Sequence, residues 1–326
     1  MSRYRRVASS VGVAAVVVGC LVTPPVQASG SAMGLTCDGQ PVTITGTDGD
    51  DVIDGTPGDD VIVALAGDDV IRGGGGSDVI CGGDGDDTML GGPGDDRLFG
   101  EEDGATGDIL IGDAGDDYLD GGGLYYADRM KYRTEPAGVH VDLRTGIVTT
   151  SRGTDTIVWA SHTPVIYGSA YADVMVGSDG SDWMVGRGGD DTLNGGGFGD
   201  FLFGSGGDDL VDGGLGTDYF VSGGPGDDVL KSGGDDGYNT GMYGGQGDDH
   251  LIGTRGFDYG LYGGNGDDWI EGFGSADRMY GGPGDDRLNG GTGFDKGFAS
   301  DGFDTCISVE RREQCEKHRV LPNGQP

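Results

Sequence analysis

The sequence has little positive charge. It contains 20 lysine and arginine residues against 56 aspartate and glutamate residues, for a formal net charge of −36. A chain this acidic is repelled by phosphate backbones and by anionic lipid, which argues against nucleic acid or an anionic membrane as a partner. The same carboxylates attract cations. We therefore expect metal cations to be the natural partners of this chain.

Histidine is scarce, and the motifs of common hydrolases are missing. Zinc lacks its usual ligands, because no two of the four histidines cluster: His140, His162, His250 and His318. The sequence has no His-Glu-x-x-His motif and no Gly-x-Ser-x-Gly elbow. The glycine clusters are followed by Asp-Asp pairs, which would repel a phosphate. We expect a protein without catalytic activity, and a hydrolase-associated protein is the weakest alternative.

The apolar run 11–22 is too short to span a membrane comfortably. Arginines precede it, and the small-residue sequence VQA ends at Ala28. This pattern predicts a secretory signal peptide over residues 1–28, an extracellular mature protein and no transmembrane segment in the mature chain. The sequence VVGC ending at Cys20 is similar to a lipoprotein signal, so a lipid anchor at Cys20 is the alternative.

The 74 glycines fall into a repeat with a fixed period. Residues 46–99 divide without a gap into six nonapeptides: GTDGDDVID, GTPGDDVIV, ALAGDDVIR, GGGGSDVIC, GGDGDDTML and GGPGDDRLF. Position 6 is aspartate and position 8 is large and apolar in every unit. Residues 168–221 hold six more units, in which Phe220 is the last position-8 residue, and residues 263–289 hold three. A fixed register of this kind argues against disorder.

This pattern resembles the RTX calcium-binding nonapeptide G-G-x-G-x-D-x-U-x over most of the mature length. The resemblance implies an all-β fold, a right-handed parallel β-roll in two segments joined by a short β insert, with several calcium ions in its turns. The residue types agree. Glycine suits tight turns and x-U-x suits a short strand with U inward. Two units then form one coil, so that each residue lies over its counterpart 18 positions later.

Stacked coils bring the position-6 aspartates together. Strands lie about 4.8 Å apart, and two carboxylates at about 5 Å repel by about 3 kcal/mol at an effective dielectric constant of 20. Calcium takes oxygen ligands at about 2.3–2.6 Å, so one ion fits between two such carboxylates, whereas magnesium needs a smaller octahedron. The candidate calcium ligands are Asp51, Asp60, Asp69, Asp78, Asp87, Asp96, Asp173, Asp182, Asp191, Asp200, Asp209, Asp218, Asp268, Asp277, Asp286 and Asp295. The position-5 aspartates are expected to be solvated or to lie behind the ligands.

Interruptions of the repeat predict the organisation of the chain. We expect a signal peptide (1–28), an N-terminal cap (29–45), a first roll (46–131), a non-repeat β insert (132–167), a second roll (168–304) and a C-terminal cap or tail (305–326). The insert is expected to connect the rolls, with a binding loop as the alternative. Units 222–231, 232–243 and 253–262 carry insertions, and no calcium site is assigned there.

Removal of Cys20 leaves four cysteines, and an even number in an exported chain suggests disulfides. Cys306 and Cys315 close a short loop and are expected to pair. A bridge from Cys37 to Cys81 needs the N-terminal segment to fold back, because bridged Cα atoms lie within about 7 Å. That pairing stays open.

The sequence therefore predicts an exported, non-catalytic calcium-binding repeat protein that folds on extracellular calcium and has a structural or interaction role. The alternative is an adhesin or a module that binds a cell-surface or polysaccharide partner. Two columns of outward valines, Val52 with Val70 and Val61 with Val79, would supply its surface, although β propensity is the favoured explanation for them.

Overall fold

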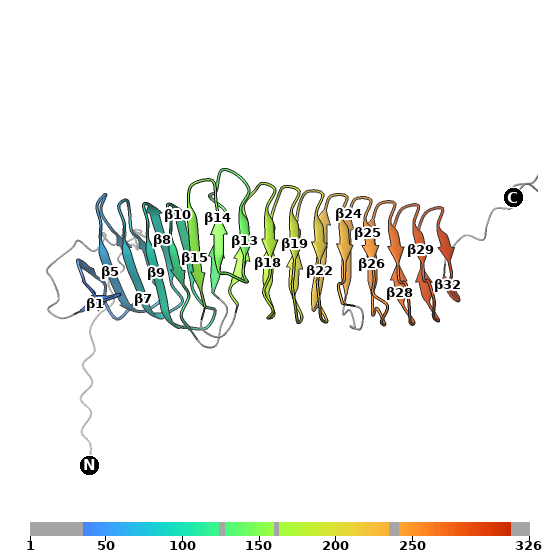
Figure 1. The fold of residues 1–326 in the computed structure, drawn as a ribbon, viewed down its shortest axis with the longest axis horizontal. Helices are drawn as coiled ribbons and strands as arrows, with labels where there is room; N and C mark the ends of the chain where they lie inside the picture. Colours follow the sequence, from blue (N-terminus) through green and yellow to red (C-terminus); the bar gives the residue numbers. More distant parts are fainter. Residues whose placement is uncertain (1–34, 124–127, 160–162, 235–240, 314–326) are drawn as a thin grey trace, which may run out of the picture.

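The computed structural model describes residues 35–123, 128–159, 163–234 and 241–313, and all regular structure within them is β. The strands follow one another in a long row along the molecule (Figure 1). The described residues contain no helix that could cross a membrane. The predicted signal peptide lies outside these residues.

Alternate strands of the chain enter two different sheets. The 14-stranded sheet has the order β32 (Arg311–Glu313), β30 (Lys296–Phe298), β28 (Arg278–Tyr280), β26 (Leu261–Asn265), β24 (Met242–Gln246), β22 (Phe220–Pro225), β20 (Phe201–Phe203), β18 (Trp183–Val185), β16 (Val165–Tyr167), β12 (Arg129–Lys131), β10 (Ile109–Ala114), β8 (Thr88–Pro93), β6 (Val70–Arg72) and β4 (Val52–Asp54). The 16-stranded sheet has the order β3 (Ile44–Thr45), β5 (Val61–Ala66), β7 (Val79–Gly85), β9 (Arg97–Asp103), β11 (Tyr118–Asp120), β15 (Thr154–Val158), β14 (Ile147–Thr149), β13 (His140–Asp142), β17 (Val174–Val176), β19 (Thr192–Asn194), β21 (Leu210–Asp212), β23 (Val229–Lys231), β25 (His250–Ile252), β27 (Trp269–Glu271), β29 (Arg287–Asn289) and β31 (Thr305–Ile307).

Within the repeats, strands pair in parallel with the strand one coil later, in the register that the repeat predicts. Ile53 pairs with Ile71 in one sheet, and Ile62 pairs with Ile80 in the other. The position-8 side chains of both sheets point inward, are buried, and form one continuous core. The expected parallel β-solenoid is confirmed. Its core holds one large side chain per strand, so it is thin for a chain of this length.

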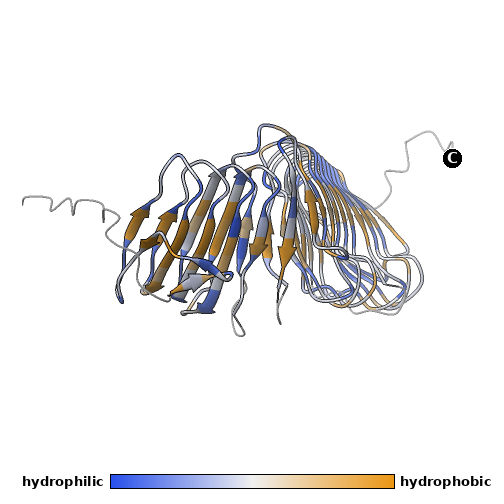
Figure 2. Ribbon diagram, turned by 60° about the vertical axis from the view of Figure 1, so that its left-hand side comes forward, coloured by the Kyte–Doolittle hydropathy of each residue, from blue (hydrophilic) through white to orange (hydrophobic). Residues whose placement is uncertain are grey.

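The insert adds strands to one sheet only. β15 pairs in parallel with β11, β14 and β13 follow in antiparallel order, and β13 pairs in parallel with β17. The 14-stranded sheet passes the same region with β12 and β16. Three strands thus stand in one sheet where an ordinary coil has one, which lengthens that sheet by about 10 Å at 4.8 Å per strand. The solenoid must bend there, and Figure 2 shows the two segments running in different directions.

The prediction is wrong for one residue that was expected in the core. Phe220 does not fill the core, because the unit that contains it carries an extra residue. The amides of Tyr219 and Phe220 both donate to the carbonyl of Asp200, at 2.9 and 3.1 Å, which is the pattern of a β-bulge. The bulge turns Phe220 outward and places Val221 in the core, in register with Leu202.

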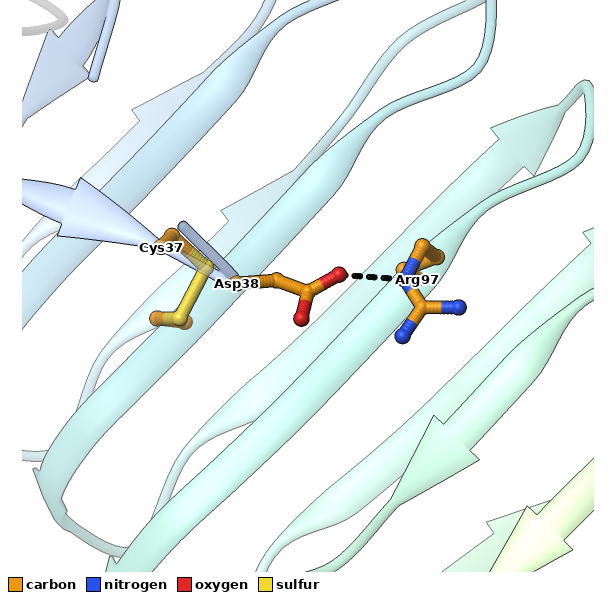
Figure 3. Close-up of a disulfide and its surroundings, with 4 residues drawn as sticks. Cys37, Asp38 and Arg97 are labelled. Atoms are coloured by element: carbon orange, nitrogen blue, oxygen red, sulfur yellow. Dashed lines mark hydrogen bonds and ion pairs between the residues drawn. A yellow bond between two sulfur atoms is a disulfide. The ribbon is translucent and has the colours of Figure 1, made fainter. Parts of the chain in front are cut away.

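The N-terminal segment folds back over the first coils. β1 (Thr36–Cys37) and β2 (Gln40–Pro41) form an antiparallel hairpin, and Cys37 forms a disulfide with Cys81, with Cα atoms 5.9 Å apart. Asp38 beside it makes an ion pair with Arg97, with Oδ2 and Nε 2.8 Å apart (Figure 3). The pairing that the sequence left open is therefore present. The predicted pair of Cys306 involves Cys315, which lies outside the described residues.

The hairpin also covers one of the two columns of outward valines. Val61 and Val79 are buried in a small cluster with Cys37, Val42 and other apolar residues, so this column is not an exposed surface. Sequence periodicity correctly placed these side chains on the outer face of the sheet, but it could not show that the cap covers them.

Candidate metal centre

The turns between strands are built on glycine. In the unit 73–81, Gly74 and Gly76 have φ values of +112° and +105°, which side-chain-bearing residues rarely adopt. A Cβ atom on Gly74 would also overlap the carbonyl oxygen of Thr56 in the preceding coil. Both constraints explain the repeated glycine, and the resulting backbone places the position-6 aspartate at the end of the turn.

The position-6 aspartates form two columns, one at the start of the strands of each sheet. The backbone N–H of Asp60 donates to Oδ1 of Asp78 at 2.8 Å, and the N–H of Asp78 donates to Oδ1 of Asp96 at 2.8 Å. The same bond joins Asp191 to Asp209 at 2.8 Å in the second roll. Each bond fixes one oxygen of a carboxylate against the coil before it. The stacking expected from the sequence is thus present.

The second oxygen, Oδ2, has no hydrogen-bond partner in most of these side chains, although it is buried. This holds for Asp69, Asp78, Asp87, Asp96, Asp117, Asp191, Asp200, Asp209, Asp228, Asp249, Asp268, Asp277, Asp286 and Asp295. A buried carboxylate oxygen without a partner is costly, and native proteins rarely leave one. A column of them therefore indicates a ligand.

The space beside most of the unpaired oxygens is kept open by a position-1 glycine, and Ala64, at position 1 of the unit of Asp69, is an exception. A Cβ atom on Gly73 would overlap Oδ2 of Asp78 and would lie 2.7 Å from the carbonyl oxygen of Gly91, one coil later. Gly195 stands in the same relation to Oδ2 of Asp200 and to the carbonyl oxygen of Gly213. A carboxylate oxygen and a backbone carbonyl from the next coil thus border one small space.

Burial and repulsion between neighbouring carboxylates raise the pKa values of many of the aspartates in the columns. The pKa of Asp96 is raised to about 8, mainly by burial; the hydrogen bond from Asp78 opposes the shift, and the charges of Asp117 and Asp78 add to it. Burial likewise raises the pKa of Asp191 and Asp277 to about 8. These carboxylates resist ionisation in the absence of a cation, and a divalent ion beside them would reverse the balance.

The donor set suits a hard cation. The available atoms are carboxylate and carbonyl oxygens, which calcium prefers, and calcium accepts six to eight of them in a flexible arrangement. Within the described part of the chain, no group of three or more histidine, cysteine, aspartate or glutamate side chains forms a compact cluster. Each site would therefore combine carboxylates of successive coils with backbone carbonyls.

All of the candidate ligands named from the sequence lie in these columns, but four differ in their partners. Oδ2 of Asp51, Asp60, Asp173 and Asp182 accepts a hydrogen bond from the backbone of a threonine or serine in the same turn. The position-5 aspartates Asp50 and Asp59 are exposed. Each accepts a bond from the position-5 amide of the next coil.

The columns contain aspartates that the sequence analysis missed. The N–H of Asp87 donates to Asp108 at 2.7 Å, that of Asp209 to Asp228 at 2.8 Å, and that of Asp117 to Asp155, in the insert, at 3.1 Å. The further members are Asp117, Asp128, Asp249, Asp258, Asp304 and Glu310. Most insertions lie in the turns and leave the strand register intact. The local signal D-x-U-x identifies most of these aspartates, whereas strict nine-residue spacing does not. It does not identify Asp258, which is followed by Tyr259 and Gly260, or the glutamate Glu310.

Comparison with family models decides the relationship. The model of the RTX calcium-binding nonapeptide repeat matches residues 45–80, 73–104, 103–123, 167–202, 185–220, 242–259 and 262–297, together more than half of the chain. The chain belongs to the RTX calcium-binding repeat family. The missed aspartates Asp108, Asp117 and Asp249 lie within matched RTX segments.

Other comparisons add less. A solved structure similar to this RTX chain is the X-ray structure of a hyperactive, Ca2+-dependent, β-helical antifreeze protein from an Antarctic bacterium. The two are 17% identical with a TM-score of 0.36, over 81% of this chain and 83% of the other. No curated protein matches the chain.

Proposed function

We propose that this protein is an exported, non-catalytic RTX protein that binds several calcium ions between its coils and folds when it meets extracellular calcium. The observation that carries the proposal is the column of buried aspartates whose Oδ2 atoms lack a partner and border glycine-lined spaces. Turns of this composition have no other evident reason to concentrate negative charge in the interior.

The chain prepares each site with its own backbone. The amide of one aspartate holds Oδ1 of the next, so Oδ2 is directed toward the position-1 glycine, as in Asp78 and Gly73. Calcium, when bound, supplies positive charge between successive coils and completes the coordination of these oxygens. Because the apolar core is thin, we infer that this contribution decides whether the roll is stable.

Export follows from the same dependence. Calcium is scarce in the cytoplasm and plentiful outside cells, so a calcium-dependent roll stays unfolded until it is exported. The predicted signal peptide at residues 1–28 supports this localisation, with the lipid anchor at Cys20 as the alternative. We also propose the domain boundaries that the interruptions of the repeat predict.

An adhesive or polysaccharide-binding role is the second candidate, and an aromatic ladder favours it. Side chains on the outer face of the 14-stranded sheet stack one above another in the second roll: Trp183, Phe203, Phe220, Tyr243, Tyr262, Tyr280 and Phe298. Tyr243 and Tyr262, for example, have centroids 4.9 Å apart and planes 3° apart. The ring faces cover one another, so a partner would meet mainly ring edges.

Circular dichroism of the mature chain tests the main proposal. The β signal is expected to be weak in chelator and to increase in millimolar calcium, with magnesium at the same concentration as the control. Equal spectra with and without calcium would contradict it. Pull-downs on cell walls and polysaccharides, beside esterase and protease assays, separate the second candidate and the hydrolase alternative.

A further inference from the structure

The turns of the solenoid are of two kinds, and the residue at position 2 of each unit separates them. In one kind the position-2 residue has a positive φ and the Oδ2 atom of the following position-6 aspartate lacks a partner, as in Gly74 with Asp78 and Arg187 with Asp191. We call these open turns. In the other kind, which we call hydroxyl turns, position 2 is threonine or serine with a negative φ.

In hydroxyl turns the aspartate is satisfied within its own unit. The backbone N–H of Ser178 donates to Oδ2 of Asp182 at 2.6 Å, and its hydroxyl lies 3.1 Å from the same oxygen. The hydroxyl also accepts the N–H of Gly180 at 3.0 Å. Thr56 holds Oδ2 of Asp60 through its N–H at 2.6 Å. The remaining hydroxyl turns are Thr47 with Asp51, Ser169 with Asp173 and Thr254 with Asp258.

Ser205 shows that the backbone conformation decides the kind of turn. It is a serine at position 2, but its φ is +84°. Its N–H therefore turns away and donates to the carbonyl of Gly223 in the next coil at 2.7 Å, and Oδ2 of Asp209 has no partner. A hydroxyl at position 2 is thus not sufficient. The N–H must also point at the aspartate.

Four of the five hydroxyl turns occur where runs of repeats begin. Thr47 and Thr56 lie in the first coil of the first roll, and Ser169 and Ser178 lie in the first coil of the second roll. Thr254 is the exception, because it lies in the interrupted unit 253–262 within the second roll. A starting coil has no complete coil of nonapeptides before it. A turn that satisfies its own carboxylate suits that position.

We propose that the hydroxyl turns bind no calcium, and that each roll therefore begins with a metal-independent coil on which the calcium-bound coils assemble. This inference rests on the proposed function and says which turns it applies to. The N–H and hydroxyl of the position-2 residue occupy the carboxylate oxygen that an open turn offers to the ion. Threonine or serine thus takes the place of the metal at the start of each roll.

Two serine substitutions in the second roll form a matched pair. Ser178→Gly removes the hydroxyl and permits the positive φ of an open turn. Ser205→Gly makes the same chemical change where the turn is already open. Native mass spectrometry in calcium should count one more bound ion in Ser178→Gly than in the wild type, and an unchanged number in Ser205→Gly. Thr56→Gly, in the first roll, should also gain one ion and serves as a second test if Ser178→Gly fails to fold.

The outcomes separate this inference from the proposed function. Bound calcium in the wild type, without a gain in either Ser178→Gly or Thr56→Gly, would overturn the inference and leave the proposed function standing. An equal gain in Ser205→Gly would also overturn it, because that turn is already open. A wild type that binds no calcium would remove both.

Discussion

The backbone N–H of Asp78 donates a 2.8 Å hydrogen bond to Oδ1 of Asp96, one coil later, and Oδ2 of Asp96 is buried without a partner. The hydrogen bond to Oδ1 holds the carboxylate in place, and Oδ2 is left for a ligand. Repetition of this relationship along both sheets produces columns of closely spaced negative charge. The following predictions depend on how a cation changes the balance of these columns.

Asp78→Asn should have opposite effects with and without calcium. In chelator the substitution removes one of several like charges, so any residual structure should become more stable. In calcium it removes a charged ligand, and we expect destabilisation of about 3 kcal/mol, the usual scale for loss of one member of a buried ionic pair. Thermal unfolding in both conditions measures this. Asp59→Asn, at the exposed neighbouring position, is the control and should change stability by less than about 0.5 kcal/mol.

Gly73→Ala should fill the space beside the carboxylate of Asp78 and so block the proposed metal site there. The added Cβ atom would overlap Oδ2 of Asp78 and crowd the carbonyl of Gly91. We expect loss of bound calcium and destabilisation of about 1–3 kcal/mol in calcium. Gly49→Ala is the matched control, because no atom lies within 4 Å of its added Cβ and its φ is not positive. Similar ion counts for the two variants by native mass spectrometry would exclude a role for the space beside Gly73.

The calcium-free chain should respond to pH in an unusual direction for an acidic protein. Burial raises the pKa of Asp96, Asp249 and Asp277 to about 8, against about 3.9 in an unfolded chain. Protonation therefore stabilises the folded, metal-free state, fully below about pH 4, and this stabilisation is lost as the pH rises through about 8. Circular dichroism in chelator should show more β structure at acidic than at alkaline pH.

Calcium reverses that dependence. The ion competes with protons for the same oxygens, so calcium affinity should increase between about pH 6 and pH 8, with release of protons on binding. Titration calorimetry in two buffers of different ionisation enthalpy measures both quantities. Affinity that falls over this range would contradict the assignment of these aspartates as ligands.

The disulfide should stabilise the first roll. Cys37 and Cys81 are 44 residues apart, and closing a loop of that length gives about 4 kcal/mol in the chain-entropy description. The variant Cys37→Ser with Cys81→Ser should lower the melting temperature in calcium and expose Val61 and Val79 beneath the hairpin. Hydrogen exchange locates the change, and equal protection of β5 and β7 in both proteins would argue against it.

Much of this architecture could be predicted from the sequence, because a strict period fixes register. The pairing of Ile53 with Ile71 and the stacking of Asp60 with Asp78 follow from the 18-residue offset alone. Features that depend on local insertions could not be predicted in the same way. The bulge that turns Phe220 outward needs one extra residue at a particular bond, and no period specifies where that residue goes.

The candidate site shows the same division. Nine-residue spacing located the aspartates of the regular blocks but missed Asp228, because the strand after an insertion recovers its register through pairing with its neighbour. The two kinds of turn could not be predicted from the sequence either. Ser178 and Ser205 are the same residue at the same position, and only their φ angles, set by contacts between coils, distinguish them.

The most direct test of the account is a crystal structure of the mature chain grown in calcium, with anomalous diffraction data to locate the ions. The account predicts anomalous peaks between successive open turns, within about 2.3–2.6 Å of aspartate Oδ2 atoms such as that of Asp78. Aspartate columns without peaks, with those oxygens bound to water or to other protein groups, would contradict it.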